Sequence, residues 1–314
     1  MCKLFSSLML FICLSFNGYV NAKENEHSSK KVYAQIKDIY NPTIQDYYLI
    51  QDYLAKGERE GLEKLNYTAR RQRNCKIIGN SPDLMPESGM IAVNTDVDDR
   101  ENCLVLYASF NLHYPAGLKR LIQLVKESDF KGHILYHMGG WPDLEGGSLT
   151  LAHVPFAFKP CCFKEAKKLG FKRALWLDTS VIPLVSLNTI FAMIEEKGYF
   201  SIKNCHQVGP YCNSKTAAYF GLTHKQTYKI VSCQAGFLGV DFTTDQGNKI
   251  IDLWYQAAKD THAFYSARSD QTALSLVLHQ CNLTCLPDCT VNTHSPRRRT
   301  PSTLFVVDRR FVQH

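Results

Sequence analysis

Short apolar runs and longer amphipathic segments alternate along the last two thirds of the chain. The apolar runs have the length of strands and end in polar or glycine-rich residues; they span 103–109, 133–137, 171–177, 199–203, 231–241 and 304–307. Between them lie segments with apolar residues at helical spacing, at 118–125, 155–169, 187–197, 245–259 and 269–279. Strands that alternate with helices predict an α/β fold, a mostly parallel sheet flanked by helices and joined by right-handed crossovers.

The N-terminal part of the chain has a different pattern. Asn41-Pro42 is typical of a helix start, and a second helix is expected at 59–70. Residues 79–99 are rich in Pro, Gly, Asn and Asp, which predicts a loop. We therefore expect an N-terminal helical extension with a loop at 23–100, the α/β domain at 101–290 and a basic tail at 291–314.

The first 22 residues have the layout of a secretory signal peptide. Lys3 precedes an apolar segment at 4–16, and Val20-Asn21-Ala22 offers a cleavage site. The apolar segment is shorter than the ~20 residues that a membrane-spanning helix needs. We expect a protein exported into the secretory pathway, to a lumen, the periplasm or the extracellular space. It is held at a membrane only if the signal segment stays uncleaved.

Composition limits the partners. The formal net charge of the 314 residues is +7, without the long basic stripe interleaved with aromatics that is typical of nucleic-acid binders. Of 12 cysteines, Cys2 and Cys13 lie in the signal segment, so 12 − 2 = 10 remain. An even, high count in an exported chain indicates disulfide bonds, with the pairing open. A metal cluster at Cys281, Cys285 and Cys289 is the less favoured alternative.

One strand end stands out as a candidate binding site. The apolar run 174–177 stops at Asp178, and Thr179 and Ser180 follow. In open α/β sheets ligands bind outside the carboxyl ends of strands, so Asp178 is placed to face a ligand. An aspartate that only caps the following turn is the alternative.

Four motifs in order resemble the nucleotide-sugar-dependent glycosyltransferases of the GT-A fold. Trp176-Leu-Asp-Thr-Ser180 is similar to the strand-ending D-x-D element, and Lys159-Pro160 to a frequent upstream K-P pair. Ala235-Gly-Phe-Leu-Gly239 resembles a strand near the acceptor site, and Ser269-Asp270-Gln271 a helix start of glycogenin-like members. The resemblance covers about 102–280 and implies a GT-A-like fold.

The resemblance also implies a donor site for a UDP- or GDP-linked sugar. Its donor-binding residues are Ser109, Tyr114, Lys159, Asp178 and Ser180. In the family the two acids of D-x-D contact ribose and Mn²⁺ or Mg²⁺, whereas here Ser180 replaces the second acid and is a weaker ligand for a hard cation. His294 is the candidate to complete the metal site with Asp178. Lys159 or the arginines at 297–299 could supply positive charge without metal.

The resemblance also indicates residues for catalysis and for the acceptor. Asp270 and Gln271 are the candidate catalytic residues, with a helix N-cap as the alternative role of Asp270. Trp141, Gly236 and Asp241 are the candidates on the acceptor side. The resemblance predicts a glycosyltransferase with an unknown acceptor. Three alternatives stay open: a non-catalytic sugar or nucleotide binder, a secreted hydrolase with a carboxylate pair, and a disulfide-rich interaction protein.

Overall fold

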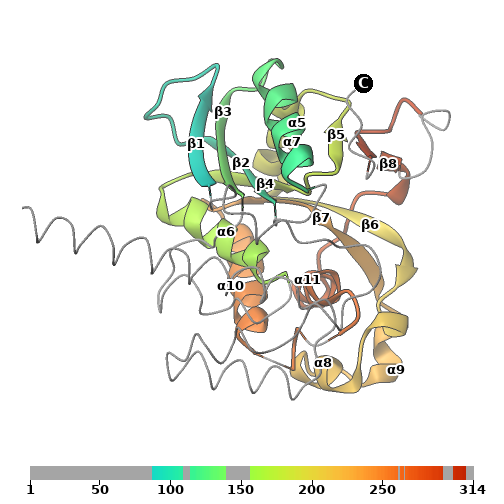
Figure 1. Cartoon of the computed structure of the whole chain (residues 1–314). Coiled ribbons are helices and arrows are strands. Elements are labelled where there is room, and N and C mark those ends of the chain that lie inside the picture. The colour runs from blue at the N-terminus through green and yellow to red at the C-terminus, as the bar shows by residue number, and fades with distance from the viewer. Residues whose placement is uncertain are drawn as a thin grey trace, which may run out of the picture.

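Two β-sheets organise the protein, whose structure is a computed structural model (Figure 1). It describes residues 87–108, 114–138, 156–260, 262–264, 266–292 and 300–308. The large sheet has the order β1-β3-β2-β4-β7-β6. Its strands are β1 (Glu87–Val93), β2 (Asn102–Ala108), β3 (Gly132–Met138), β4 (Arg173–Leu177), β6 (Tyr199–Gln207) and β7 (Val231–Asp241). The small sheet joins β5 (Val181–Pro183), β9 (Phe305–Val307) and β8 (Val291–Asn292).

The large sheet is mixed and not mostly parallel as expected, since two of its five strand pairings are parallel and three are antiparallel. Strand β2 pairs in parallel with β3 and with β4. Strand β7 is antiparallel to both β4 and β6, and β1 is antiparallel to β3. Four strands (β2, β3, β4 and β6) therefore run in one direction, and β1 and β7 run in the other. The predicted α/β class is confirmed.

Helices cover both faces of the large sheet (Figure 1). One face carries α5 (Tyr114–Lys126) and α7 (Leu187–Lys197), and the other carries α6 (Phe158–Lys168), α10 (Asp245–Lys259) and α11 (Ser269–Gln280). The helices expected at 187–197 and 245–259 are confirmed over their full length. The short elements η1 (Gly209–Tyr211), α8 (Ser214–Tyr219) and α9 (His224–Thr227) lie between β6 and β7, and η2 (Asp288–Thr290) precedes β8.

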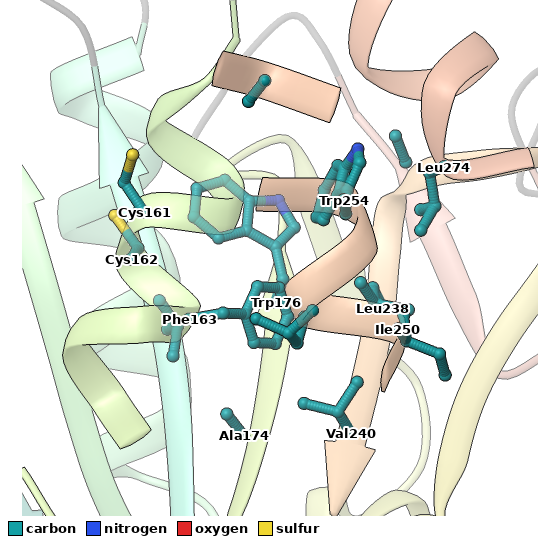
Figure 2. Packing of buried hydrophobic residues seen from close by; sticks show 14 of the residues in the cluster. Cys161, Cys162, Phe163, Ala174, Trp176, Leu238, Val240, Ile250, Trp254 and Leu274 are labelled. Atoms are coloured by element: carbon teal, nitrogen blue, oxygen red, sulfur yellow. The ribbon is translucent and has the colours of Figure 1, made fainter. Parts of the chain in front are cut away.

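Alternation along the central strands separates two hydrophobic cores. Trp176 of β4 packs into the core under α6 and α10, together with Phe163 and Trp254 (Figure 2). Its neighbours Leu175 and Leu177 enter the core on the face of α5 and α7. Successive side chains of a strand point to opposite faces, so a five-residue strand supplies both cores. β4 is consequently held on both sides, and its end is a rigid place for a functional group.

The segment 79–99, predicted as a loop, contains the strand β1 at Glu87–Val93. β1 pairs with β3 over seven positions, from Glu87 opposite Met138 to Val93 opposite Gly132. Gly89 lies against the ring of Tyr136, where an added Cβ would be 2.9 Å from the ring. Local Gly, Pro and Asp signals predicted the loop, but backbone pairing with β3 outweighs them. The sheet thus begins before residue 101.

The C-terminal segment also belongs to the folded part, since β8 and β9 pair with each other and β9 pairs with β5. The late strand expected at 304–307 is confirmed at Phe305–Val307. The signal segment and the helices expected near 41 and at 59–70 lie outside the described residues. Within the described ranges, no helix combines the length and the apolar character that crossing a membrane requires.

Candidate functional site

Asp178 follows β4 directly, at the carboxyl end of a central strand. Its backbone N–H donates to the carbonyl of Gly236 on β7, at 3.0 Å. Its Oδ1 accepts a hydrogen bond from Trp176 Nε1, at 2.9 Å. The side chain of Asp178 is 42% exposed. The strand thus delivers a fixed carboxylate that still faces solvent.

Lys159, in the first turn of α6, contacts both acidic side chains of the site. Its Nζ lies 3.1 Å from Asp178 Oδ1 and 2.7 Å from Asp270 Oδ2, and it donates to the carbonyl of Ala235 at 3.0 Å. An ammonium group has three N–H donors, and these three acceptors match that number. Lys159 is only 4% exposed. It therefore organises two acids and does not offer a free positive charge to a phosphate.

Asp270 reaches the site from the first turn of α11. The residue at the N-cap position is Arg268, in the left-handed region at φ 56° and without a side-chain cap bond. Asp270 therefore pairs with Lys159 and does not serve as the helix N-cap. Its side chain is 10% exposed, so the pair with Lys159 is shielded from water.

A glycine makes room for the exposed acid. A Cβ built on Gly236 would lie 2.9 Å from Asp178 Oδ2 and 3.2 Å from its Cγ. The carboxylate of Asp178 therefore rests directly on the backbone of β7. Glycine is the residue that permits such a close approach.

The electrostatics of the cluster follow from its composition. Burial alone lowers the pKa of Lys159, but the carboxylates of Asp178 and Asp270 outweigh it and raise that pKa above its usual range. Two carboxylates and one ammonium leave the cluster with a net negative charge. The exposed part of this charge is on Asp178, so the site favours a cation or hydroxyl donors at that point.

Gln271 points to a second group of polar side chains. Its Nε2 donates to Ser232 Oγ at 3.0 Å and lies 3.5 Å from His206 Nε2. His206 also contacts Arg268, whose guanidinium stacks over the ring of Tyr211 at 4.0 Å. His206, Tyr211 and Arg268 were not predicted as site residues from the sequence. Only Arg268, directly before the Ser269-Asp270-Gln271 motif, had a sequence signal that could have indicated it.

The other candidate residues do not join the cluster. Ser180 is 7% exposed, and its carbonyl accepts from the backbone N–H of Asp308. Tyr114 is the first residue of α5 and is 43% exposed. Asp241 is opposite Arg173 at the other end of β4 and forms an ion pair with it at 3.2 Å. The other three predicted site residues, Ser109, Trp141 and His294, lie outside the described residues.

No disulfide bond joins the cysteines of the described part. Cys103, Cys161, Cys162 and Cys233 are buried, whereas Cys205 and Cys289 are exposed. None of Cys281, Cys285 and Cys289 belongs to the group of metal-ligand side chains that the described ranges bring together. The disulfide bonds expected from the sequence remain a prediction.

The geometry as a whole is a rigid, negatively charged strand end with one exposed carboxylate, built from β4, α6, β7 and α11. Such a site can bind a metal ion together with an anionic ligand, or hydrogen-bond to hydroxyl groups. The sequence matches no protein-family profile and no curated protein.

Proposed function

We propose that the protein is a glycosyltransferase that moves a sugar from a UDP- or GDP-linked donor to an acceptor, with Asp178 at the donor site. One observation carries the proposal. Lys159, Asp178, Gly236 and Asp270, four residues singled out by the resemblance to the GT-A fold, come from four separate elements and meet at one strand end. Independent motifs that converge in space support a common function.

The sheet is in keeping with this proposal. β2, β3 and β4 form the parallel part of the sheet, and β7 runs antiparallel between β4 and β6. In open α/β sheets, the carboxyl ends of such strands are where nucleotides bind. Asp178 stands at that edge, and Asp270 approaches it from the α11 side.

The residues present fit a divalent cation that arrives with its substrate. Mg²⁺ is commonly held by one or two carboxylates together with substrate phosphates, and Asp178 offers one half-exposed carboxylate. Asp178 would hold Mn²⁺ or Mg²⁺ there, and the bound ion would supply positive charge to the diphosphate leaving group. The buried Lys159 has its donors engaged, so it orients Asp178 and Asp270 and does not replace the metal.

Binding of the donor is the direct test. The thermal stability of the full chain is measured with a panel of UDP- and GDP-sugars, with and without Mn²⁺, followed by release of nucleoside diphosphate in the presence of candidate acceptors. A ligand of the native state raises the apparent stability by about 2.7 kcal/mol at 100 times its Kd. We expect one donor to stabilise the protein in a metal-dependent way.

Two variants and one control make the test specific. Asp178→Asn keeps the shape and removes the charge, and Gly236→Ala keeps the acid but pushes a methyl group against it; both should lose the metal-dependent shift. Asp252→Asn breaks a comparable surface pair, between Lys164 of α6 and Asp252 of α10 at 2.9 Å, and should keep the shift. A chain that responds to no donor refutes the proposal.

A non-catalytic sugar-nucleotide binder is the second candidate, because Ser180 is buried and is not an acid. The same experiment separates it from the enzyme. A donor that binds through Asp178, without release of nucleoside diphosphate to any acceptor or to water, favours the binder.

A further inference from the structure

Three potential metal ligands meet between β3 and α6, beside the cluster around Lys159. His137 is the penultimate residue of β3, and Cys162 and Glu165 are three residues apart on α6. Residues at this spacing share one face of a helix. A strand and a helix that are both packed into the core hold the three side chains, so their arrangement is set by the fold.

The ligand atoms of the group are close and largely buried. One nitrogen of His137, the sulfur of Cys162 and one carboxylate oxygen of Glu165 all lie within 4.8 Å of one another. His137 Nε2 is 2.6 Å from Glu165 Oε2. His137 is 6% exposed, Cys162 is fully buried and the Glu165 side chain is 18% exposed. Glu165 is therefore the most exposed of the three side chains.

The chemical types of the three ligands indicate which metal ion the group can bind. A thiolate and an imidazole favour zinc and similar transition metals over Mg²⁺ and Ca²⁺, which prefer oxygen. Zinc sites with three protein ligands keep a fourth position for water or substrate. Bond lengths of about 2.0–2.3 Å in a tetrahedron place neighbouring ligand atoms about 3.3–3.7 Å apart. The contact of His137 with Glu165 must then open by roughly an ångström, which the partly exposed glutamate can provide.

A plain hydrogen bond between His137 and Glu165 is the simpler account of those two residues. The sulfur of Cys162 also lies within 4.8 Å of both ligand atoms, so three potential metal ligands meet at this point. The neighbouring Cys161 is equally buried but is not part of the group. Cys161 and Cys162 are equally buried, but only Cys162 lies beside a histidine and a glutamate. A comparison of the two therefore tests whether this position, and not burial alone, is needed for metal binding.

We propose that His137, Cys162 and Glu165 bind one Zn²⁺ ion, with a fourth position open toward solvent. Cys162 lies one helical turn beyond Lys159 on α6. A metal bound here ties α6 to β3 and so holds Lys159 in register with Asp178 and Asp270. This site is distinct from the Mn²⁺ or Mg²⁺ position at Asp178, and it does not depend on the proposed transferase activity.

Cobalt is a visible probe for this site. The full chain is reduced, stripped of metal with a chelator and titrated with Co²⁺ and then with Zn²⁺, while the sulfur-to-cobalt charge-transfer absorption and the bound metal are measured. We expect one Co²⁺ per chain with a thiolate band that Zn²⁺ abolishes by displacement. Zn²⁺ should also raise the temperature of unfolding.

The variants decide between the readings. Cys162→Ser should lose the band, and His137→Gln and Glu165→Gln should weaken binding at least about tenfold, the lower end of the losses seen even for outer-shell partners. Cys161→Ser should keep the band, and a combined change of Cys281, Cys285 and Cys289 to Ser controls for the C-terminal cysteines. If Cys162→Ser does not fold, Glu165→Gln decides, because its side chain is partly exposed.

Three outcomes overturn the proposal: no stoichiometric binding by the wild-type chain, a band that persists unchanged in Cys162→Ser or in Glu165→Gln, and a band that disappears only in the C-terminal triple variant.

Discussion

At the scale of single residues, Lys159 shows what a buried charge requires. Removing an ammonium from water is costly, and the cost is recovered only when its donors are satisfied and its charge is balanced. Here one carbonyl and two carboxylates surround the Nζ atom within 3.1 Å. Asp178 and Asp270 are therefore placed by the same atom. A substitution of any one of the three residues therefore changes the contacts and the charge balance of the other two.

Replacing Lys159 by Met should destabilise the protein strongly. The substitution leaves Asp270 buried without its cation, and removing one partner of a buried ion pair costs about 3–5 kcal/mol. Urea unfolding at neutral pH measures the loss. The double variant Lys159→Met/Asp270→Asn should regain part of it, because the remaining carboxylate, Asp178, is 42% exposed and can be hydrated. A double variant less stable than Lys159→Met contradicts this account.

At the scale of elements, α10 packs so closely against the end of β7 that the contact position on the helix has no room for a side chain. Gly247, in the first turn of α10, faces the carbonyl of Asp241. Thr244 caps the same turn and accepts from the Gly247 N–H at 3.0 Å. The cap and the glycine together bring the helix onto the strand. The position of α10 then fixes Trp254, whose Nε1 donates to the carbonyl of Asp270 at 3.2 Å.

Gly247→Ala should therefore destabilise the protein although alanine favours helices. Exchanging Gly for Ala in a helix usually gains about 0.5–1 kcal/mol. Here the new Cβ would lie 2.1 Å from the oxygen of Asp241, and overpacking of this kind costs about 1–3 kcal/mol. The net expectation is a loss of stability in urea unfolding. Lys249→Ala, at an exposed position of α10, is the control and should stay within about 0.5 kcal/mol of the wild type.

At the scale of the whole molecule, buried thiols in the cores make the stability of the protein depend on pH in the alkaline range. Burial raises the pKa of the thiols of Cys103, Cys161 and Cys233 above its usual range. The native state keeps these protons at pH values where the unfolded chain, with thiol pKa values of about 8.5, has released them. The contribution of these thiols to stability is therefore complete below about pH 8.5 and is lost progressively as the pH rises above it.

The expected slope is up to about 1.4 kcal/mol per pH unit for each of the three thiols. Urea unfolding under reducing conditions between pH 7.5 and 10 measures it. Changing Cys103, Cys161 and Cys233 together to Ala should flatten the profile, while Cys205→Ser, at an exposed thiol, should leave it as it is. An equally steep decline in the triple variant assigns the alkaline loss to other groups. Lys159, whose pKa is raised, adds its own loss only above about pH 10.4.

The sequence by itself determined the elements around the site and the individual residues of the site. Continuous apolar runs and helical spacing predicted β7, α7 and α10 at their observed bounds. The buried positions of a strand or helix recur with the period of that element, so the local sequence shows them. Asp178 was predicted because it ends an apolar strand, and ligands of open α/β sheets bind outside the carboxyl ends of the strands. Lys159, Gly236 and Asp270 came from the resemblance of short motifs.

Tertiary structure alone decided how these parts combine. The strand β1 was misread as a loop because its pairing with β3, a partner about 45 residues away in sequence, has no local signal. The shared ion pairs of Lys159, and the separation of Asp241 from Asp178 by the length of β4, depend on strand order and direction. The same holds for His137, Cys162 and Glu165, which no spacing in the sequence brings together. Contacts between distant segments are set by the packing of elements, and local patterns of residues do not encode them.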